Sequence, residues 1–134
     1  MTIKLEQTLH DFFHLESFRE WQKEIIESIV EGNDTLVFMP TGWWKSLTYQ
    51  LPWVVLDGVC VVISPLISLM KDQVDSLTEL WIKAKLINST ITPSQIDEIL
   101  HELQSNTSNP IKFLYILNWV CVIKTPHHLP QHPY

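Results

Sequence analysis

The chain has 134 residues, of which 46% are apolar and 18% charged, so it can form one domain with a buried core and is not disordered by composition. Its net charge is −6, and Arg19 is its only arginine. This charge balance argues against a protein that binds nucleic acid tightly on its own through a broad basic face, but a local basic strip stays possible. Glycine is scarce, with 3 residues, whereas tryptophan is frequent, with 6.

The two cysteines, Cys60 and Cys121, each lie in an apolar run and lack the spacing of a metal site, so we expect buried free thiols. The N-terminus lacks the apolar core of a signal peptide. The longest apolar run, over 59–70, is interrupted by Ser and Pro and is shorter than the ~20 residues of a membrane span. These features predict a soluble, cytoplasmic protein.

The N-terminal part of the chain predicts two helices and a strand. Apolar residues at helical spacing indicate a helix over 5–13. Ser17 is the expected N-cap of a second helix, because Glu20 three residues later completes a capping box. A turn at 32–34 then leads into a β-type run over 35–39, which we expect to be a strand.

The middle of the chain predicts a helix, a strand and another helix. The first of these helices, over 45–56, contains Pro52, which is expected to end or kink it. The continuous β-branched run over 59–63 is typical of a parallel strand that is covered on both faces. Apolar residues on one side of 66–81 indicate the next helix.

The C-terminal part continues the alternation with a weaker strand over 83–87, a helix over 92–103 that has Pro93 at an early position, and a strand over 112–116. Strands alternating with helices predict an α/β fold with a parallel sheet and right-handed crossovers. The Pro- and His-rich residues 125–134 are expected to form a disordered tail rather than a metal site, because no partner ligands are spaced for one.

Residues 39–46 have the layout of a phosphate-binding loop, because they join the expected strand to the helix that begins at Lys45. In such a loop, backbone N–H groups at the helix N-terminus hold the phosphates. Lys45 would add positive charge, and the Ser46 hydroxyl would reach Mg²⁺. Lys45 and Ser46 are therefore the candidate catalytic residues, and Ser46 is the candidate metal ligand.

Several segments, in this order, resemble the first motifs of RecQ-type DNA helicases of superfamily 2: 18–22, 39–52, 63–74 and 86–89. The run Ser-Pro-Leu-Ile-Ser-Leu-Met-Lys-Asp-Gln over 64–73 is the most specific of them. The resemblance covers about 9–115 and implies a partial RecA-like, three-layer domain of the P-loop NTPase fold. It also implies ATP-driven 3′-to-5′ unwinding in DNA repair and recombination, with ATP and Mg²⁺ as cofactors and single-stranded or duplex DNA as partner.

The resemblance implies a role for each matching residue. Adenine recognition falls to Leu15, Arg19 and Gln22, of which Gln22 would bond the base edge and Arg19 would stack on the base. The phosphate loop comprises Met39, Pro40, Thr41, Gly42, Trp43, Trp44, Lys45 and Ser46. Contacts to the backbone of single-stranded DNA fall to Ser64, Pro65, Ser68, Lys71, Asn88 and Ser89. Without the order of the segments, Arg19, Gln22 and Lys71 would equally fit solvated helix surfaces.

Tryptophan stands at four positions where the family has glycine or commonly has it: Trp21, Trp43, Trp44 and Trp81. A phosphate loop uses glycine because its backbone approaches the ligand closely and adopts positive φ. We therefore expect ATP binding to be weak or absent. Because glycine and tryptophan codons can differ by a single base, the pattern indicates either a decayed gene or an error in the sequence.

The family's Asp-Glu-Ala-His box, which holds Mg²⁺ and positions the attacking water, does not occur in the sequence, and neither does a second motor domain. We expect residues 1–124 to form a partial helicase ATP-binding domain, truncated before the Walker B strand and left with an unpaired sheet edge. Two interpretations stay open. The chain is either a fragment of a RecQ-type helicase that does not unwind DNA alone, or a non-enzymatic remnant that acts as a small nucleic-acid-binding module without ATP hydrolysis.

Overall fold

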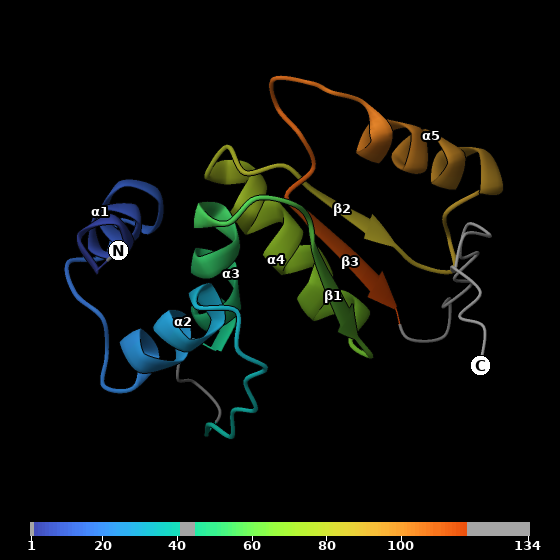
Figure 1. Cartoon of the computed structure of the whole chain (residues 1–134). Coiled ribbons are helices and arrows are strands. Elements are labelled where there is room, and N and C mark those ends of the chain that lie inside the picture. The colour runs from blue at the N-terminus through green and yellow to red at the C-terminus, as the bar shows by residue number, and fades with distance from the viewer. Residues whose placement is uncertain (1, 41–44, 118–134) are drawn as a thin grey trace, which may run out of the picture.

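The computed structural model describes residues 2–40 and 45–117, in which helices alternate with parallel strands (Figure 1). The helices are α1 (Thr2–Phe13), α2 (Gln22–Val30), α3 (Lys45–Val55), α4 (Ile67–Glu79) and α5 (Pro93–Gln104). The strands are β1 (Cys60–Ser64), β2 (Ala84–Ile87) and β3 (Phe113–Leu117). The expected boundary between a domain over 1–124 and a tail over 125–134 lies outside the described residues.

The strands form a parallel sheet in the order β1-β3-β2, as predicted for an α/β fold. The register aligns Ser64 of β1 with Leu117 of β3, and Ile87 of β2 with Ile116 of β3. Because all these strands run in one direction, their carboxyl ends meet at one edge of the sheet. β1 and β2 lie on either side of β3, two strand spacings or about 10 Å apart.

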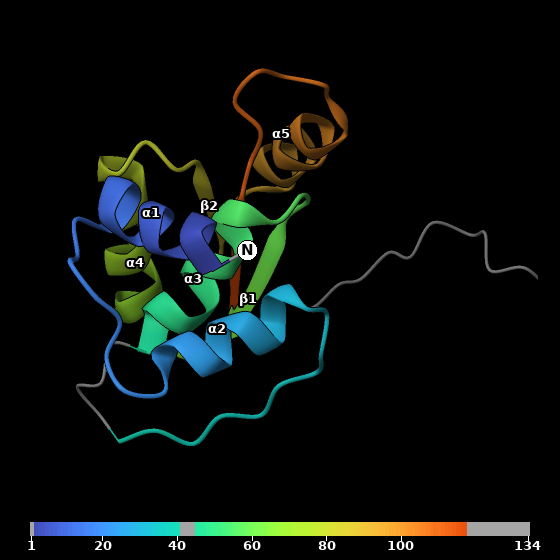
Figure 2. The same ribbon diagram turned by 60° about the vertical axis from the view of Figure 1, so that its left-hand side comes forward.

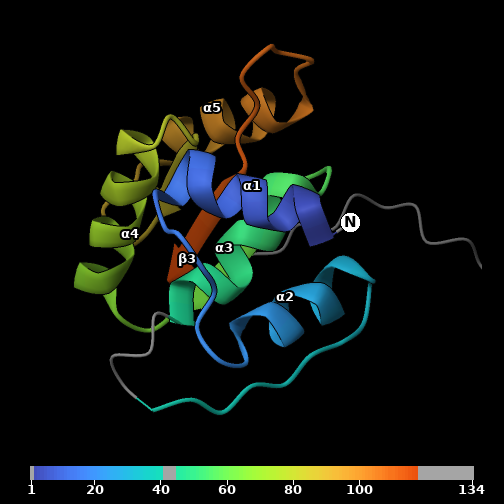
Figure 3. The same cartoon turned by 90° about the vertical axis from the view of Figure 1, so that its left-hand side faces the viewer.

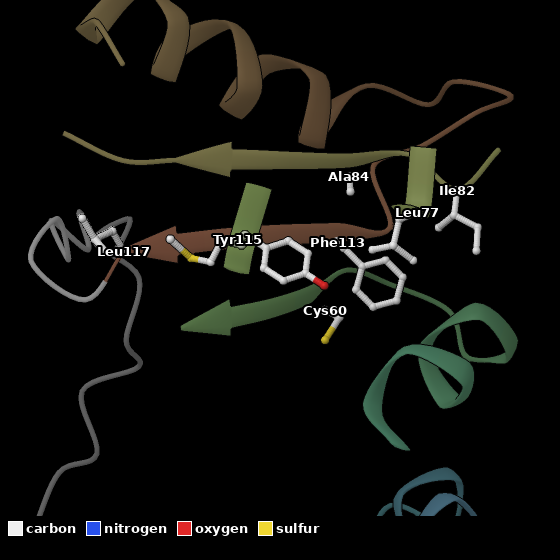
Figure 4. Packing of buried hydrophobic residues seen from close by; sticks show 8 residues of the cluster. Cys60, Leu77, Ile82, Ala84, Phe113, Tyr115 and Leu117 are labelled. Atoms are coloured by element: carbon white, nitrogen blue, oxygen red, sulfur yellow. The ribbon is translucent and has the colours of Figure 1, made fainter. Parts of the chain in front are cut away.

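The main core lies on the face of the sheet that α3 and α4 cover. Buried side chains from α4 and from each strand meet there, and half-buried Tyr49 and Trp53 of α3 pack against them. Figure 4 shows Phe113, Tyr115 and Leu117 following one another along β3, with Cys60 of β1 beside them. Burying each large apolar side chain stabilises the fold by roughly 1.5–3 kcal/mol.

On the opposite face, α5 packs over β2 and β3, where Ile99 contacts the cluster of Ile87 and Leu114 (Figure 2). β1 is not covered on this face, because 53% of Val61 and 61% of Ile63 are exposed. The prediction that this strand is covered on both faces is therefore wrong within the described residues. The reason is that α5, which follows β2 in the chain, packs beside β2 and does not reach β1.

The N-terminal helices pack against α3 through a second apolar cluster, away from the sheet (Figure 3). Its fully buried members are Leu5, Leu9, Ile26, Leu47 and Leu51. An exposed ion pair between Lys23 Nζ and Glu6 Oε1, at 2.9 Å, adds a contact between α1 and α2.

The start of α2 differs from the prediction, which placed the N-cap at Ser17. The helix begins at Gln22, and its N-cap residue is Trp21, whose backbone is left-handed with φ of 72°. A residue in this conformation cannot continue a helix, so no helix runs through it from Ser17. The turn before α2 is closed instead by the Arg19 N–H, which donates to Gln22 Oε1 at 2.7 Å.

The strand expected over 35–39 is absent, and that prediction is wrong. These residues run along the outside of α2 toward α3 as an irregular segment (Figure 3), and 88% of Phe38 is exposed. A strand needs a neighbouring strand to accept and donate its backbone hydrogen bonds. None of the described strands pairs with this segment, so its β-type sequence does not produce a strand.

The other expected elements are confirmed with small shifts at their ends. Pro52 lies inside α3 and does not end it. Thr92 caps α5 in a capping box with Gln95. Cys60 is a buried free thiol, as expected, whereas Cys121 lies outside the described residues. Among the described residues, no helix has the length and apolar character to cross a membrane, and no group of His, Cys, Asp or Glu side chains is arranged to hold a metal ion.

Candidate nucleic-acid interface

The carboxyl end of β1 leads directly into α4 and presents polar groups at the edge of the sheet. Ser64 is the last residue of β1, and its Oγ accepts a hydrogen bond from the Leu66 N–H at 3.3 Å. α4 then begins at Ile67, and Ser68 and Lys71 in its first turns are exposed. A helix start leaves its first N–H groups without intrahelical partners and carries a partial positive charge. This turn can therefore bind an anion such as a phosphate.

The carboxyl end of β2 adds a second set of polar groups at the same edge. Asn88 follows β2 directly, and its Oδ1 accepts from the Thr90 N–H at 3.0 Å and from Thr90 Oγ1 at 2.6 Å. These bonds hold the turn and leave Ser89 exposed. Since Ile87 aligns with Ile116 and Ser64 with Leu117, Asn88 lies level with Ser64 on the far side of β3.

The structure thus brings all the predicted DNA-contact residues to one edge of the sheet. The groups they offer are hydroxyls, a side-chain amide, helix N–H groups and the Lys71 ammonium, which are the donors that proteins use to position phosphates. Three acidic residues of α4, Asp72, Asp75 and Glu79, are also exposed. Any attraction for an anion is therefore local to the start of α4 rather than a field of the whole helix.

The residues of the predicted phosphate loop are described only at its ends. Lys45 is exposed at the start of α3, and Ser46 beside it is half-buried. Lys45 borders a cavity of about 350 Å³ that Val37, Phe38, Met39, Thr48 and Tyr49 also line. An ammonium and a hydroxyl at a helix start fit the phosphates and Mg²⁺ of a nucleotide. Thr41, Gly42, Trp43 and Trp44 lie outside the described residues, so the obstruction expected from the tryptophans stays a prediction.

The predicted adenine residues lie in the segment before α2 and at its first residue. Leu15 packs against the cluster of α1, α2 and α3, and Arg19 is exposed in the turn before α2. Gln22 is buried at the start of α2, and its Oε1 already accepts the Arg19 N–H. A base edge would have to compete with this bond for the Gln22 carboxamide. α2 packs against α3, which links this turn to the helix of Lys45.

Two of the tryptophans at glycine-like positions have the backbone conformation that favours glycine. Trp21 has φ of 72° and is 47% exposed, and Trp81, between α4 and β2, has φ of 61° and is 92% exposed. A side chain at positive φ costs roughly 1–2 kcal/mol relative to an ordinary backbone. The structure therefore supports the inference, made from sequence, that glycine suits both positions better.

A polar network in the core was not expected from the sequence. Tyr49 Oη donates to Gln73 Oε1 at 2.5 Å and lies 3.2 Å from Tyr115 Oη, to which Gln50 Nε2 donates at 3.2 Å. Burial raises the pKa of both tyrosines above the ordinary value, so their hydroxyls stay protonated at neutral pH. The sequence pattern that could have indicated this network is the presence of polar residues in otherwise apolar stretches of α3 and β3.

Comparison with known proteins places the chain in a helicase family. Residues 19–125 match the DEAD/DEAH box helicase family. The chain is 42% identical, over 97% of its length, to 21% of the ATP-dependent DNA helicase RecQ of Pasteurella multocida. It is 44% identical, over 84% of its length, to 22% of the probable ATP-dependent DNA helicase RecS of Bacillus subtilis. It is 38% identical, over 84% of its length, to 18% of the rat ATP-dependent DNA helicase Q1. The chain thus spans about a fifth of the length of these relatives.

Proposed function

Because the chain belongs to the DEAD/DEAH box helicase family and matches its RecQ-type members, we propose that it supplies a DNA-contact surface and a phosphate-loop region of a RecQ-type ATP-dependent DNA helicase. The observation that carries the proposal is the gathering of Ser64, the first turn of α4 and Asn88 at one edge of the parallel sheet. Unwinding is not proposed for this chain, which spans only part of its relatives.

Single-stranded DNA would lie across this edge with its phosphates toward the donors. Lys71 and the start of α4 would hold one phosphate, while Ser64, Pro65, Ser68, Asn88 and Ser89 would contact neighbouring backbone groups. Contacts of this kind position a strand without reading its sequence. Since the net charge of the chain is −6, binding depends on these local groups. With Lys71 as their single cation, binding should weaken only modestly as salt is added.

The first test is a titration of a fluorescein-labelled oligothymidylate with the full chain, followed by anisotropy at several salt concentrations. Lys71→Ala should weaken binding several-fold and lower the salt slope by about 0.7, because one phosphate contact is lost. Lys4→Ala, which removes an exposed lysine of α1, is the matched control and should leave both unchanged. Equal losses in the two variants would reject the surface, since only a general charge effect would then remain.

We also propose that Lys45 and Ser46 contact the phosphates and Mg²⁺ of ATP, with Leu15, Arg19 and Gln22 toward the base. Bound Mg²⁺-ATP supplies the free energy of hydrolysis that drives helicases. Trp43 and Trp44 oppose this binding, because a loop around phosphate needs close backbone approach and positive φ. A loss of ~4 kcal/mol would weaken affinity about a thousandfold.

The second test is a nucleotide titration of the full chain beside the double variant Trp43→Gly/Trp44→Gly. The chain as written should bind ATP weakly or not at all, and the double variant should bind at least about a hundredfold more tightly. Lys45→Ala in the double variant should remove that gain, as expected for a phosphate contact. Micromolar affinity in the chain as written would refute the proposed obstruction.

A second candidate function is a nucleic-acid-binding module without ATP hydrolysis. The left-handed backbone at Trp21 and Trp81 favours it, because tryptophan stands there in a conformation that suits glycine. The sequence also has tryptophan at the glycine-like positions 43 and 44 of the loop. The two candidates differ in their response to nucleotide. A chain that binds oligothymidylate with the Lys71 dependence described above, yet fails to bind ATP even after Trp43→Gly/Trp44→Gly, would be the module.

A further inference from the structure

A continuous set of hydrogen bonds joins α3 to α4 through the core of the sheet. Its members are Gln50 and Tyr49 on α3, Tyr115 on β3 and Gln73 on α4. Gln50 and Tyr115 are buried, and Tyr49 and Gln73 are half-buried. Water therefore cannot readily replace the bonds at the centre of this set, and its geometry is fixed by the surrounding packing.

The protons in this network have one consistent arrangement. The Tyr49 hydroxyl has a single proton, which it donates to Gln73 Oε1, so in its contact with Tyr115 it must accept. The Tyr115 hydroxyl therefore donates to Tyr49 and accepts from Gln50 Nε2. Every bond points from Gln50 toward Gln73, and bonds aligned in this way polarise and strengthen one another.

The network lies between the two proposed binding regions. Tyr49 is four residues after Lys45 and so lies one turn along the same side of α3. Gln73 is two residues after Lys71 on α4, whose first turn forms part of the proposed DNA surface. α3 packs mainly against α1 and α2, whereas α4 packs against β2 and β3. Both helices contribute side chains to the main core, and the network adds a direct polar link between them.

We infer that this network couples the helix of the phosphate loop to the helix of the DNA surface, with Tyr49 and Gln73 as positioning residues. A displacement of α3 on nucleotide binding would move the Tyr49 hydroxyl, and Gln73 would follow to keep its bond. The position of Ser68 and Lys71 would then depend on the state of the loop. The identity of the two ligands rests on the proposed function, but the link between the helices does not.

The link is tested on the full chain without ligand, by hydrogen exchange read on the opposite helix. Tyr49→Phe, on α3, should speed exchange of α4 amides over 70–79 at least about threefold. Gln73→Leu, on α4, should do the same for α3 amides over 49–55. Gln73→Glu keeps an acceptor oxygen for Tyr49 and should leave α3 protected. Effects confined to the substituted helix in both cases would overturn the inference.

The coupling itself is tested in the Trp43→Gly/Trp44→Gly chain by measuring oligothymidylate affinity with and without a non-hydrolysable Mg²⁺-ATP analogue. We expect the two affinities to differ at least about fivefold, a usual size for coupled sites. Tyr49→Phe should bring this ratio close to one while changing each separate affinity less than about twofold, and Gln73→Glu should retain it. An unchanged ratio in Tyr49→Phe, or a ratio of one with Tyr49 present, would overturn the coupling. Absence of DNA binding with Tyr49 present would instead reject the proposed function, and the exchange measurement still decides the link.

Discussion

The DNA-contact region and the phosphate-loop region of this molecule are built on different supports. In the DNA-contact region, β1 and β2 are held by the parallel sheet. Its register sets Ser64, the last residue of β1, level with Asn88, which follows β2. The segment before α3 has no strand beside it among the described residues, and it runs exposed along α2. A helix satisfies its own backbone, but a strand depends on a neighbour. The DNA-contact region is therefore positioned by strand pairing, whereas the phosphate-loop region is positioned by helix packing alone.

The largest expected difference between the regions is in the free energy of unfolding. Phe113→Ala removes a fully buried ring from the sheet core and should lower this free energy by about 3–5 kcal/mol. Phe38→Ala removes a ring of the same kind from the exposed segment and should change it by less than about 0.5 kcal/mol. Urea unfolding followed by circular dichroism measures both. A large loss in Phe38→Ala would mean that residues 35–39 form a buried strand after all.

The two clusters should also differ in alkaline solution. Burial raises the pKa of the Cys60 thiol from 9.0 to about 11, whereas the cluster of α1, α2 and α3 contains only hydrocarbon side chains. The unfolded thiol ionises first as the pH rises, so the stability due to Cys60 is complete below about pH 9 and is lost up to about pH 11. The loss is on the order of 3 kcal/mol, at about 1.4 kcal/mol per pKa unit.

Urea unfolding at steps from about pH 8 to about pH 11 measures this loss. Cys60→Ala should flatten the pH dependence up to about pH 10, and the buried tyrosines should still lower stability above that pH, because their pKa values are raised too. Identical pH profiles with and without Cys60 would contradict the raised pKa of its thiol.

Replacing Trp81 should stabilise the connection between α4 and β2. Trp81→Gly relieves a left-handed backbone without removing buried surface, and it should raise the free energy of unfolding by about 1 kcal/mol. Trp53→Gly is the matched control, because Trp53 lies inside α3 and packs on the core. That variant should lose at least about 3 kcal/mol. A loss in Trp81→Gly would show that the indole makes a stabilising contact.

The smallest effect concerns Thr92, which caps a helix in the structure, and Ser17, which was predicted to cap one. Thr92 accepts a hydrogen bond from the Gln95 N–H and completes a capping box, so Thr92→Ala should cost about 1 kcal/mol. Ser17 lies before the left-handed Trp21 and caps no helix, so Ser17→Ala should cost less than about 0.5 kcal/mol. Thermal unfolding of both variants measures the difference, and equal losses would restore Ser17 as a cap.

Local patterns predicted the elements that depend on local interactions. The β-branched run at β1 and Pro93 at the start of α5 each accompany the expected element. The run over 35–39 has a comparable pattern but forms no strand, because a strand needs a second segment to pair with. The predicted start of α2 at Ser17 was wrong. Glu20 completes the sequence pattern of a capping box there, but the backbone at Trp21 is left-handed and the helix begins after it.

The candidate site was predictable as a set of residues but not as a surface. Motif order singled out Ser64, Lys71 and Asn88, yet their common location follows from the strand order β1-β3-β2, which no spacing reveals. The bond between Tyr49 and Gln73 joins residues of different helices and depends on the same packing. The loop residues 41–44 lie outside the described residues, so their obstruction of ATP stays a prediction.

The most direct test of this account is hydrogen exchange of the full chain with and without saturating oligothymidylate. We predict slower exchange of amides over 67–71 and 88–90, at the carboxyl edge of the sheet, and no change over 33–39. The same protection pattern should be weaker in Lys71→Ala and intact in Lys4→Ala. Protection over 33–39 with none at the start of α4 would contradict the assignment of DNA contact to the sheet edge.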